Sequence, residues 1–130
     1  MILCDTDVII EFYKNNSQII HELRIIGQSN IAVSAITQAE LYFGALNKAE
    51  LRKIQKHLKS IRVFPLDNLI SRKFISLMES LSLSHKISIP DALVAATALI
   101  HSIELYTLNT TDFQFIKNIQ LYKPIGFKSE

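Results

Sequence analysis

The sequence has no tryptophan, one cysteine, and only 3 glycines and 3 prolines among its 130 residues. So little glycine and proline, together with 48% hydrophobic residues, excludes a disordered or low-complexity chain. A single cysteine excludes an internal disulfide, and the apolar run around Cys4 predicts a core position for it. A chain of this length is expected to form one domain over residues 1–130.

Long apolar runs are also missing from the sequence. None approaches the roughly 20 residues that a membrane-spanning helix needs. The first residues, Met-Ile-Leu-Cys-Asp, lack the basic start of a secretion signal. We therefore expect a cytoplasmic protein with no membrane partner, and the near absence of cysteine fits a reducing compartment.

Charge is almost balanced overall, with 14 basic and 12 acidic residues, but it is unevenly distributed along the chain. Three acids fall within the first eleven residues, whereas six bases fall within positions 48–62. These bases are Lys48, Arg52, Lys53, Lys56, Lys59 and Arg62. They predict either a solvated helix face or a surface for a polyanion such as nucleic acid.

Short apolar segments alternate with amphipathic segments along the whole chain. The short segments at 1–5, 31–34, 61–65, 104–108 and 119–122 predict buried strands. The segments at 7–14, 17–27, 37–46, 49–60, 67–81 and 88–101 predict helices, and the segment at 82–89 predicts a loop. This alternation predicts an α/β sandwich, with a mainly parallel central sheet of about five strands and helices on both faces.

The segment 88–101 combines a buried helix with a carboxylate. Ser88, Pro90 and Asp91 suit the start of a helix. Alanine, leucine, valine and isoleucine then occupy nearly every side, which indicates a helix inside the core. Asp91, in the first turn of such a helix, must either meet a partner or open onto a cleft.

Four carboxylates are expected to meet at one edge of the predicted sheet. Asp5 ends the first strand, and Glu40 begins the helix that follows the second strand. Asp91 begins the helix before the fourth strand, and Asp112 follows that strand. In an open parallel sheet, ligands bind outside the carboxyl ends of the strands, where these acids are placed.

Each of these acids, taken singly, also has a structural explanation. Three of them stand three residues after a possible helix cap: Thr37 before Glu40, Ser88 before Asp91, and Asn109 before Asp112. Asp5 is harder to explain in this way, because it ends an apolar strand. Together the four carboxylates would repel one another, and a hard divalent cation would remove that repulsion. Ligands that are all oxygen favour Mg²⁺ or Mn²⁺ over zinc.

In four blocks the sequence resembles the PIN-domain nucleases, and among them the VapC-type toxins of bacterial toxin–antitoxin pairs. The blocks are LCDTD at 3–7, SAITQAELYFGA at 34–45, PDALVAATA at 90–98 and TLNTTDF at 107–113. They occur in the family's order and span nearly the whole chain. The resemblance implies a PIN-like three-layer sandwich and an endoribonuclease that cleaves RNA with metal-activated water.

The resemblance also assigns roles to the acids. By position, Asp5 and Asp91 would be the principal ligands of Mg²⁺, with Mn²⁺ as an alternative. Glu40 would hold metal or orient water, and Asp112 would complete the catalytic set. The family further implies an RNA substrate, a cognate antitoxin protein and a homodimer.

Several polar residues beside the acids match the family pattern, and two positions depart from it. Thr6, Asn109 and Thr110 match the supporting polar positions. Asp7 stands where many relatives carry Asn or Ser, and Leu108 where many carry a basic residue.

Three alternatives remain open at the level of sequence. One is a PIN nuclease of RNA processing that is not a toxin, and another is a PIN-like module that only binds RNA or protein. The third is a phospho-receiver signalling domain, with Asp5 and Asp7 as its acidic pair, Asp67 as the acceptor and Lys123 as its lysine. The four histidines lack ligand-like spacing and are expected to be surface or packing residues.

Overall fold

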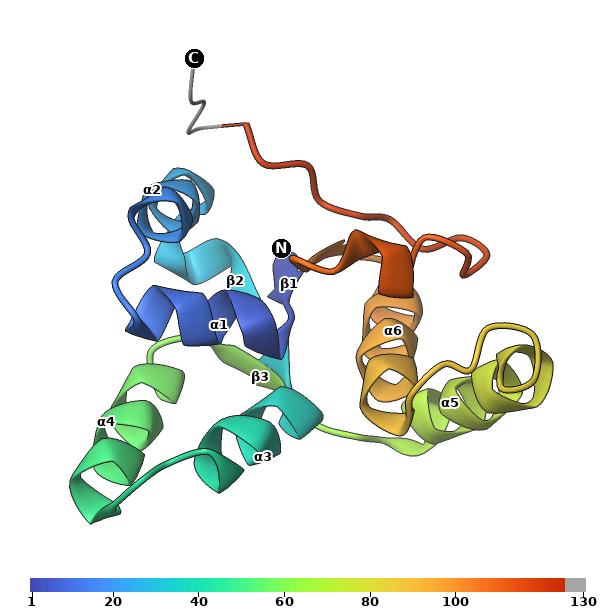
Figure 1. The fold of residues 1–130 in the computed structure, drawn as a ribbon, viewed down its shortest axis with the longest axis horizontal. Helices are drawn as coiled ribbons and strands as arrows, with labels where there is room; N and C mark the ends of the chain where they lie inside the picture. The colour runs from blue at the N-terminus through green and yellow to red at the C-terminus, as the bar shows by residue number, and fades with distance from the viewer. Residues whose placement is uncertain (126–130) are drawn as a thin grey trace.

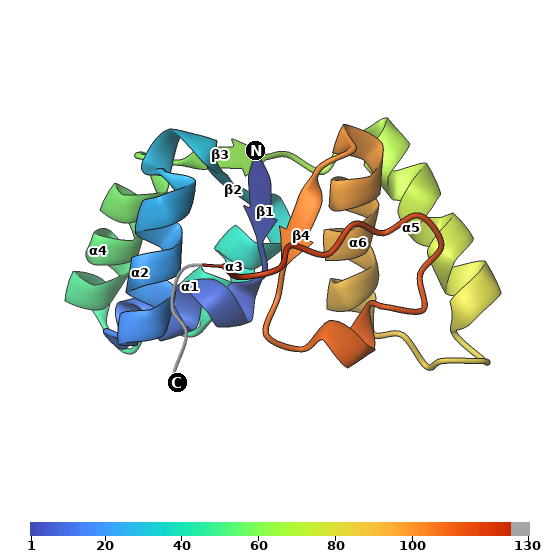
Figure 2. The ribbon, with the colours of Figure 1, turned by 90° about the horizontal axis from the view of Figure 1, so that it is seen from above.

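A parallel four-stranded sheet forms the centre of the protein in the computed structural model, which describes residues 1–125 (Figures 1 and 2). The strands lie in the order β3-β2-β1-β4. Their bounds are β1 (Ile2–Cys4), β2 (Ile31–Ser34), β3 (Arg62–Phe64) and β4 (Glu104–Tyr106). In the register of the sheet, Leu3 of β1 pairs with Ala32 of β2 and with Leu105 of β4. The predicted α/β fold with a parallel sheet is confirmed.

Helices cover both faces of this sheet, as Figure 1 shows. They are α1 (Thr6–Tyr13), α2 (Ser17–Ile26), α3 (Ala35–Phe43), α4 (Lys48–Leu58), α5 (Asn68–Leu81) and α6 (Ile89–His101). Short 3-10 helices η1 (Gln28–Asn30) and η2 (Thr110–Asp112) precede β2 and follow β4. Among residues 1–125, no helix combines the length and apolar character that crossing a membrane requires.

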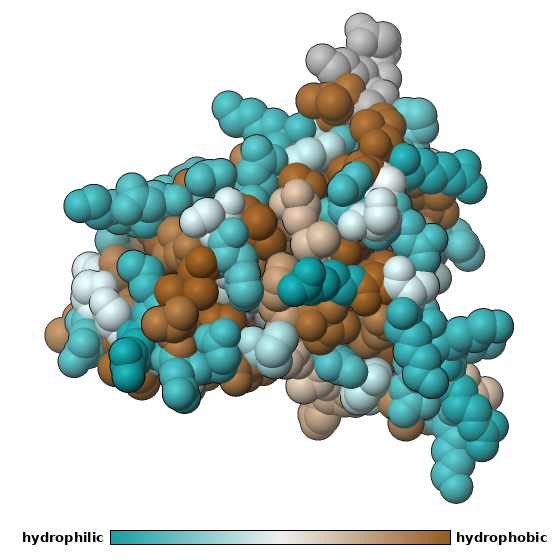
Figure 3. All heavy atoms as spheres, turned by 180° about the vertical axis from the view of Figure 1, so that it is seen from behind, coloured by the Kyte–Doolittle hydropathy of each residue, from teal (hydrophilic) through white to brown (hydrophobic). Residues whose placement is uncertain are grey.

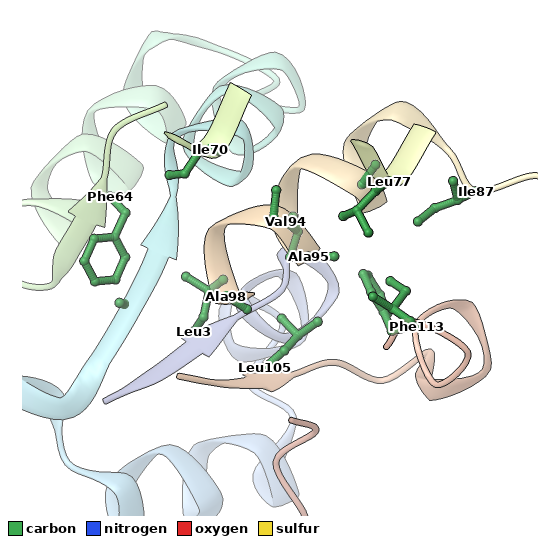
Figure 4. Packing of buried hydrophobic residues seen from close by; sticks show 14 residues of the cluster. Leu3, Phe64, Ile70, Leu77, Ile87, Val94, Ala95, Ala98, Leu105 and Phe113 are labelled. Carbon is green, nitrogen blue, oxygen red and sulfur yellow. The ribbon is translucent and has the colours of Figure 1, made fainter. Parts of the chain in front are cut away.

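Alternation along the strands divides the core into two parts, one on each face of the sheet. On β1, Leu3 packs into the cluster shared with α5 and α6, whereas Cys4 packs into the cluster shared with α1, α2 and α4. On β4, Leu105 and Tyr106 divide in the same way. Figure 4 shows the first cluster, in which Phe113 lies near α6. The strands read as continuous apolar runs because both of their faces are buried.

The predicted fifth strand at 119–122 is reduced to an isolated bridge between Leu105 and Leu121. Two backbone hydrogen bonds of 2.8 Å hold this bridge. Pairing then stops, because Pro124 has no N–H and the Ile125 N–H donates to the buried Glu22 carboxylate at 3.0 Å. The described residues therefore contain four strands rather than five.

Candidate active site

Asp5 occupies the end of β1 and caps the N-terminus of α1. Its Oδ1 accepts a hydrogen bond from the Thr6 N–H at 2.8 Å, and its Oδ2 accepts one from the Thr107 hydroxyl at 2.9 Å. Burial raises the pKa of Asp5, and the charges of Glu40 and Asp112 add to that rise, although the two hydrogen bonds oppose it. The carboxylate is thus fixed in place, and each oxygen keeps a second lone pair for a ligand.

Asp91 lies in the first turn of α6, where it is half-buried. Burial raises its pKa from 3.8 to about 6, and the charges of Asp5, Asp112 and Glu40 contribute in the same direction. Its backbone N–H donates to the Ser88 hydroxyl at 3.2 Å, so Ser88 is the cap of this helix, as predicted. The predicted gathering of Asp5, Glu40, Asp91 and Asp112 agrees with these mutual effects, and we call these four carboxylates the acidic edge.

Glu40 is held by a neighbouring helix rather than by its own. The Thr6 hydroxyl donates to Glu40 Oε1 at 2.6 Å and also lies 3.0 Å from the Thr37 hydroxyl. The predicted capping box from Thr37 to Glu40 is wrong, because α3 begins earlier and Ser34 caps it by accepting from the Ile36 and Thr37 N–H groups. Helix capping therefore does not explain Glu40, whose carboxylate is held instead by Thr6, the residue that follows Asp5.

The loop after β4 supplies one residue that the sequence did not single out. Thr107 is buried, donates to Asp5 Oδ2, and accepts from the Asn109 N–H at 3.1 Å. The feature of the sequence that could have identified Thr107 is a hydroxyl directly after a buried strand, at the same sheet edge as Asp5.

Asp112 follows in η2 and is exposed. Thr110 is exposed too, and within residues 1–125 no hydrogen bond joins its side chain to the acidic edge.

Asp7, which departs from the family pattern, binds this same loop. Its Oδ2 accepts from the Asn109 side-chain amide at 2.8 Å and from the Leu108 N–H at 3.1 Å. Burial raises the pKa of Asp7 from 3.8 to about 6, helped by the charge of Asp5. Asn109, predicted as a polar supporting residue, therefore supports the site through Asp7 rather than by contacting the four acids. Only the backbone of Leu108 takes part.

The donor set of the acidic edge fits a hydrated divalent cation. The ion pair formed within residues 1–125 joins Lys14 to Glu11, so no basic side chain there neutralises the four carboxylates. Within the same residues, no three acid, cysteine or histidine side chains are already arranged to hold one ion. Mg²⁺ does not require such a cage, because it is commonly bound through one or two carboxylates and keeps several waters. Asp5 and Asp91 can supply those two carboxylates.

Three of the four histidines pack away from the acidic edge, as expected. His57 accepts or donates a 2.8 Å hydrogen bond with the Tyr13 hydroxyl, far along α1 from Asp5. His85 stacks on Phe115, and His101 stacks on Phe64. These side chains pack against aromatic rings rather than joining an acid.

A protein-family model described as "PIN domain" matches residues 2–118. The chain belongs to the PIN-domain family. Ribonuclease VapC10 of Mycobacterium tuberculosis is 32% identical over 122 residues, which cover 92% of this chain and 91% of that protein. Among solved structures, a toxin–antitoxin complex from Klebsiella pneumoniae contains a chain with 25% identity and a TM-score of 0.80, covering 98% of this chain and 100% of that one.

VapBC-1 from nontypeable Haemophilus influenzae is also similar, with 29% identity and a TM-score of 0.80 over 94% of this chain and 97% of that one.

The phospho-receiver alternative does not hold for a PIN domain. Its proposed acceptor, Asp67, is the cap of α5 and accepts from the Ile70 N–H at 2.9 Å.

Proposed function

We propose that this PIN-domain protein is a divalent-metal-dependent endoribonuclease and the toxin of a VapBC-type toxin–antitoxin pair, acting in the cytoplasm. The observation that carries the proposal is the acidic edge itself. Burial raises the pKa values of Asp5 and Asp91 there, the charges of Glu40 and Asp112 add to both rises, and no basic side chain within residues 1–125 neutralises these acids. Ribonuclease VapC10, its curated relative, supports RNA as the substrate.

Asp5 and Asp91 would hold the ion, and Mg²⁺ is the cation we expect, with Mn²⁺ as a substitute. A bound cation of this kind lowers the pKa of a water ligand and neutralises charge on a phosphate. The chain's own contribution is to fix the geometry. Thr6 and Thr107 hold Asp5 through its two oxygens.

The remaining acids would orient the reactants. Glu40 Oε1 is occupied by the Thr6 hydroxyl, so Oε2 is available to accept a hydrogen bond from the attacking water. Asp112, exposed at the rim, would complete the site. The reaction is an in-line displacement at phosphorus, in which water forms the new P–O bond as the bond to the leaving oxygen breaks.

RNA cleavage with and without metal tests this proposal. Purified protein should cleave single-stranded or structured RNA in Mg²⁺ or Mn²⁺, EDTA should stop the reaction, and added metal should restore it. Absence of cleavage under all conditions, by a folded protein freed of any partner, would refute the nuclease proposal and favour a PIN-like module that only binds.

A protein partner is the second part of the proposal. A hollow of about 710 Å³ lies between α1, α2 and the end of α4, and it is lined largely by apolar side chains, among them Ile9, Phe12, Ile20, Leu23 and Ile61. An amphipathic antitoxin segment would fill such a groove, and the similar chains in toxin–antitoxin complexes support this assignment.

Co-expression with the protein encoded by the adjacent gene tests the groove. We expect a stable complex and relief of growth inhibition. Ile20→Glu should abolish copurification, because Ile20 lines the groove, whereas Ile25→Glu on the same helix should not, because Ile25 is 45% exposed and lies outside the lining. If the protein is harmless when expressed alone and does not copurify with the protein encoded by the adjacent gene, it would instead be a non-toxin PIN nuclease.

Light scattering of the isolated protein would test the expected homodimer.

A further inference from the structure

A concentrated positive surface lies on α4 and on the strand that follows it. We call it the basic face and define it by six exposed residues: Lys48, Arg52, Lys53, Lys56, Lys59 and Arg62. Six bases and one acid, Glu50, give the segment 48–62 a formal charge of +5, whereas the whole chain carries +2. The remainder of the chain is therefore negative, at −3, and the basic face is its main positive feature.

The cations of the basic face are not neutralised within the protein. Because the ion pair in residues 1–125 is that of Lys14 with Glu11, none of the six pairs with an acid there. Glu50 accepts from the Leu46 N–H at 3.2 Å, and the Arg62 guanidinium lies over the Phe64 ring at 4.9 Å from its centre. Like charges on neighbouring helical turns repel, so the stability of α4 does not explain this concentration.

The basic face is joined to the acidic edge by α3, which carries Glu40 and contacts α4. A hollow of about 290 Å³ lies between the two helices, and its lining is mostly polar: Gln38, Tyr42, Gln55, Leu58 and Lys59. Figure 3 shows hydrophilic side chains projecting at the lower right, where α4 lies when the molecule is seen from behind. Tyr42 and Lys59 both line this hollow. A cationic surface beside an aromatic side chain is the combination that binds single-stranded nucleic acid without reading its sequence.

We propose that the basic face binds the single-stranded RNA that flanks the scissile phosphodiester, with its phosphate backbone following α4. The inference rests on the proposed ribonuclease function and adds where the substrate is held. From Lys48 to Lys59 the helix spans roughly 16 Å at 1.5 Å per residue, enough to follow several phosphates. Contacts of this kind give affinity and position the strand, while the acidic edge performs the cleavage.

Two charge-matched variants test the inference. In the first, glutamine replaces four cations of the basic face: Arg52→Gln, Lys53→Gln, Lys56→Gln and Lys59→Gln. In the control, glutamine replaces four exposed cations on other elements: Arg24→Gln, Arg72→Gln, Lys86→Gln and Lys123→Gln. Glutamine has nearly the helix propensity of lysine and arginine, so α4 should persist. Should the fourfold variant unfold, the pair Lys53→Gln and Lys56→Gln serves in its place.

Binding is measured in EDTA with a short fluorescein-labelled single-stranded RNA of mixed sequence, over a range of salt concentrations. The negative slope of log K against log salt should become less steep by about 0.7 for each phosphate that the protein no longer neutralises, so by up to about three in the basic-face variant. The control should keep the wild-type slope. In cleavage assays with Mg²⁺, the basic-face variant should show a raised KM and a kcat within about twofold of wild type, because the acidic edge is unchanged.

Equal salt slopes and equal KM values for the two variants would overturn the inference while leaving the ribonuclease proposal intact. So would a basic-face variant that binds RNA normally but no longer binds the co-expressed protein, because the face would then belong to a protein contact. A wild-type protein that neither binds nor cleaves RNA would instead refute the proposed function, and the inference with it.

Discussion

The acidic edge and the basic face are both clusters of like charge, but they are built in opposite ways. Asp5 in the acidic edge is buried and receives hydrogen bonds on both oxygens, and Glu40 is held by a hydroxyl from another helix. The side chains of the basic face are exposed, and within residues 1–125 none of them pairs with an acid. In the acidic edge, hydrogen bonds fix the positions of individual carboxylate oxygens, whereas the basic face contributes only positive charge.

This difference predicts how each region responds to substitution. A metal site depends on the position of individual oxygens, so removing one carboxylate or its supporting hydroxyl should have a large effect. A surface that attracts a polyanion depends on the sum of its charges, so removing each cation should have a small and nearly additive effect.

The largest effect should follow substitution of the two expected metal ligands. Asp5→Asn or Asp91→Asn should lower kcat/KM for RNA by more than about 100-fold, since even removing an outer-shell partner of a metal ligand costs about 10- to 100-fold. Asp67→Asn is the control, because Asp67 caps α5 away from the acidic edge. Full activity of either ligand variant, on RNA cut by the wild type, would remove Asp5 or Asp91 from the site.

A smaller but still large effect should follow removal of the Thr107 hydroxyl. Thr107→Val keeps the shape of the side chain but leaves Asp5 Oδ2 without its 2.9 Å donor, so affinity for Mn²⁺ should decrease by about 10- to 100-fold. Thr107→Ser keeps the hydroxyl and should retain wild-type affinity. Calorimetric titration with Mn²⁺ measures both. Equal affinities for the valine and serine variants would show that Thr107 is only a packing residue.

Single substitutions on the basic face should have modest effects. Lys56→Gln should weaken RNA binding by about threefold at moderate salt, because one phosphate is no longer neutralised. Adding Lys53→Gln should weaken binding by a similar factor again. Anisotropy titrations of the two single variants and the double variant measure this. A single substitution that abolished binding would place that lysine in a specific contact rather than in a surface of summed charge.

Much of the fold could be predicted from the sequence because its patterns are unambiguous. The apolar runs ending at Asp5 and Ser34 became β1 and β2, and the apolar segment from Ser88 became the buried helix α6. The segment at 119–122 has a similar apolar pattern but lies at the sheet edge, where a single bridge replaces a strand. Whether an edge segment continues to pair depends on contacts distant in sequence, such as that of Ile125 with Glu22.

The acids could be expected at one edge because parallel topology brings strand ends and helix starts together there, and the effect of Glu40 and Asp112 on the pKa values of Asp5 and Asp91 agrees with that expectation. Their supporting bonds could not, because these link residues far apart in sequence. Thr6 reaches Glu40 across 34 positions, and Thr107 reaches Asp5 across 102. The capping box at Thr37 failed for a local reason: Ser34, three residues earlier, ends a strand and can cap the helix first.

The measurement that tests the metal site most directly is thermal unfolding of the wild type and Asp91→Asn, in EDTA and in Mg²⁺. Folding raises the pKa of Asp91 from 3.8 to about 6. The stability contributed by this group is therefore present below about pH 4 and is lost as the pH rises through about 6. At neutral pH in EDTA, the asparagine variant lacks the repelling charge and should unfold a few degrees above the wild type. At about pH 4 this difference should disappear.

Saturating Mg²⁺ should reverse the order at neutral pH, because a ligand that binds only the folded state stabilises it and the variant lacks one of the two expected ligands. Wild type above variant in Mg²⁺, and variant above wild type in EDTA, is the predicted result. If Asp91 only favours the start of α6, the variant should unfold below the wild type in EDTA and both proteins should respond equally to Mg²⁺. That result would contradict a metal site at the acidic edge.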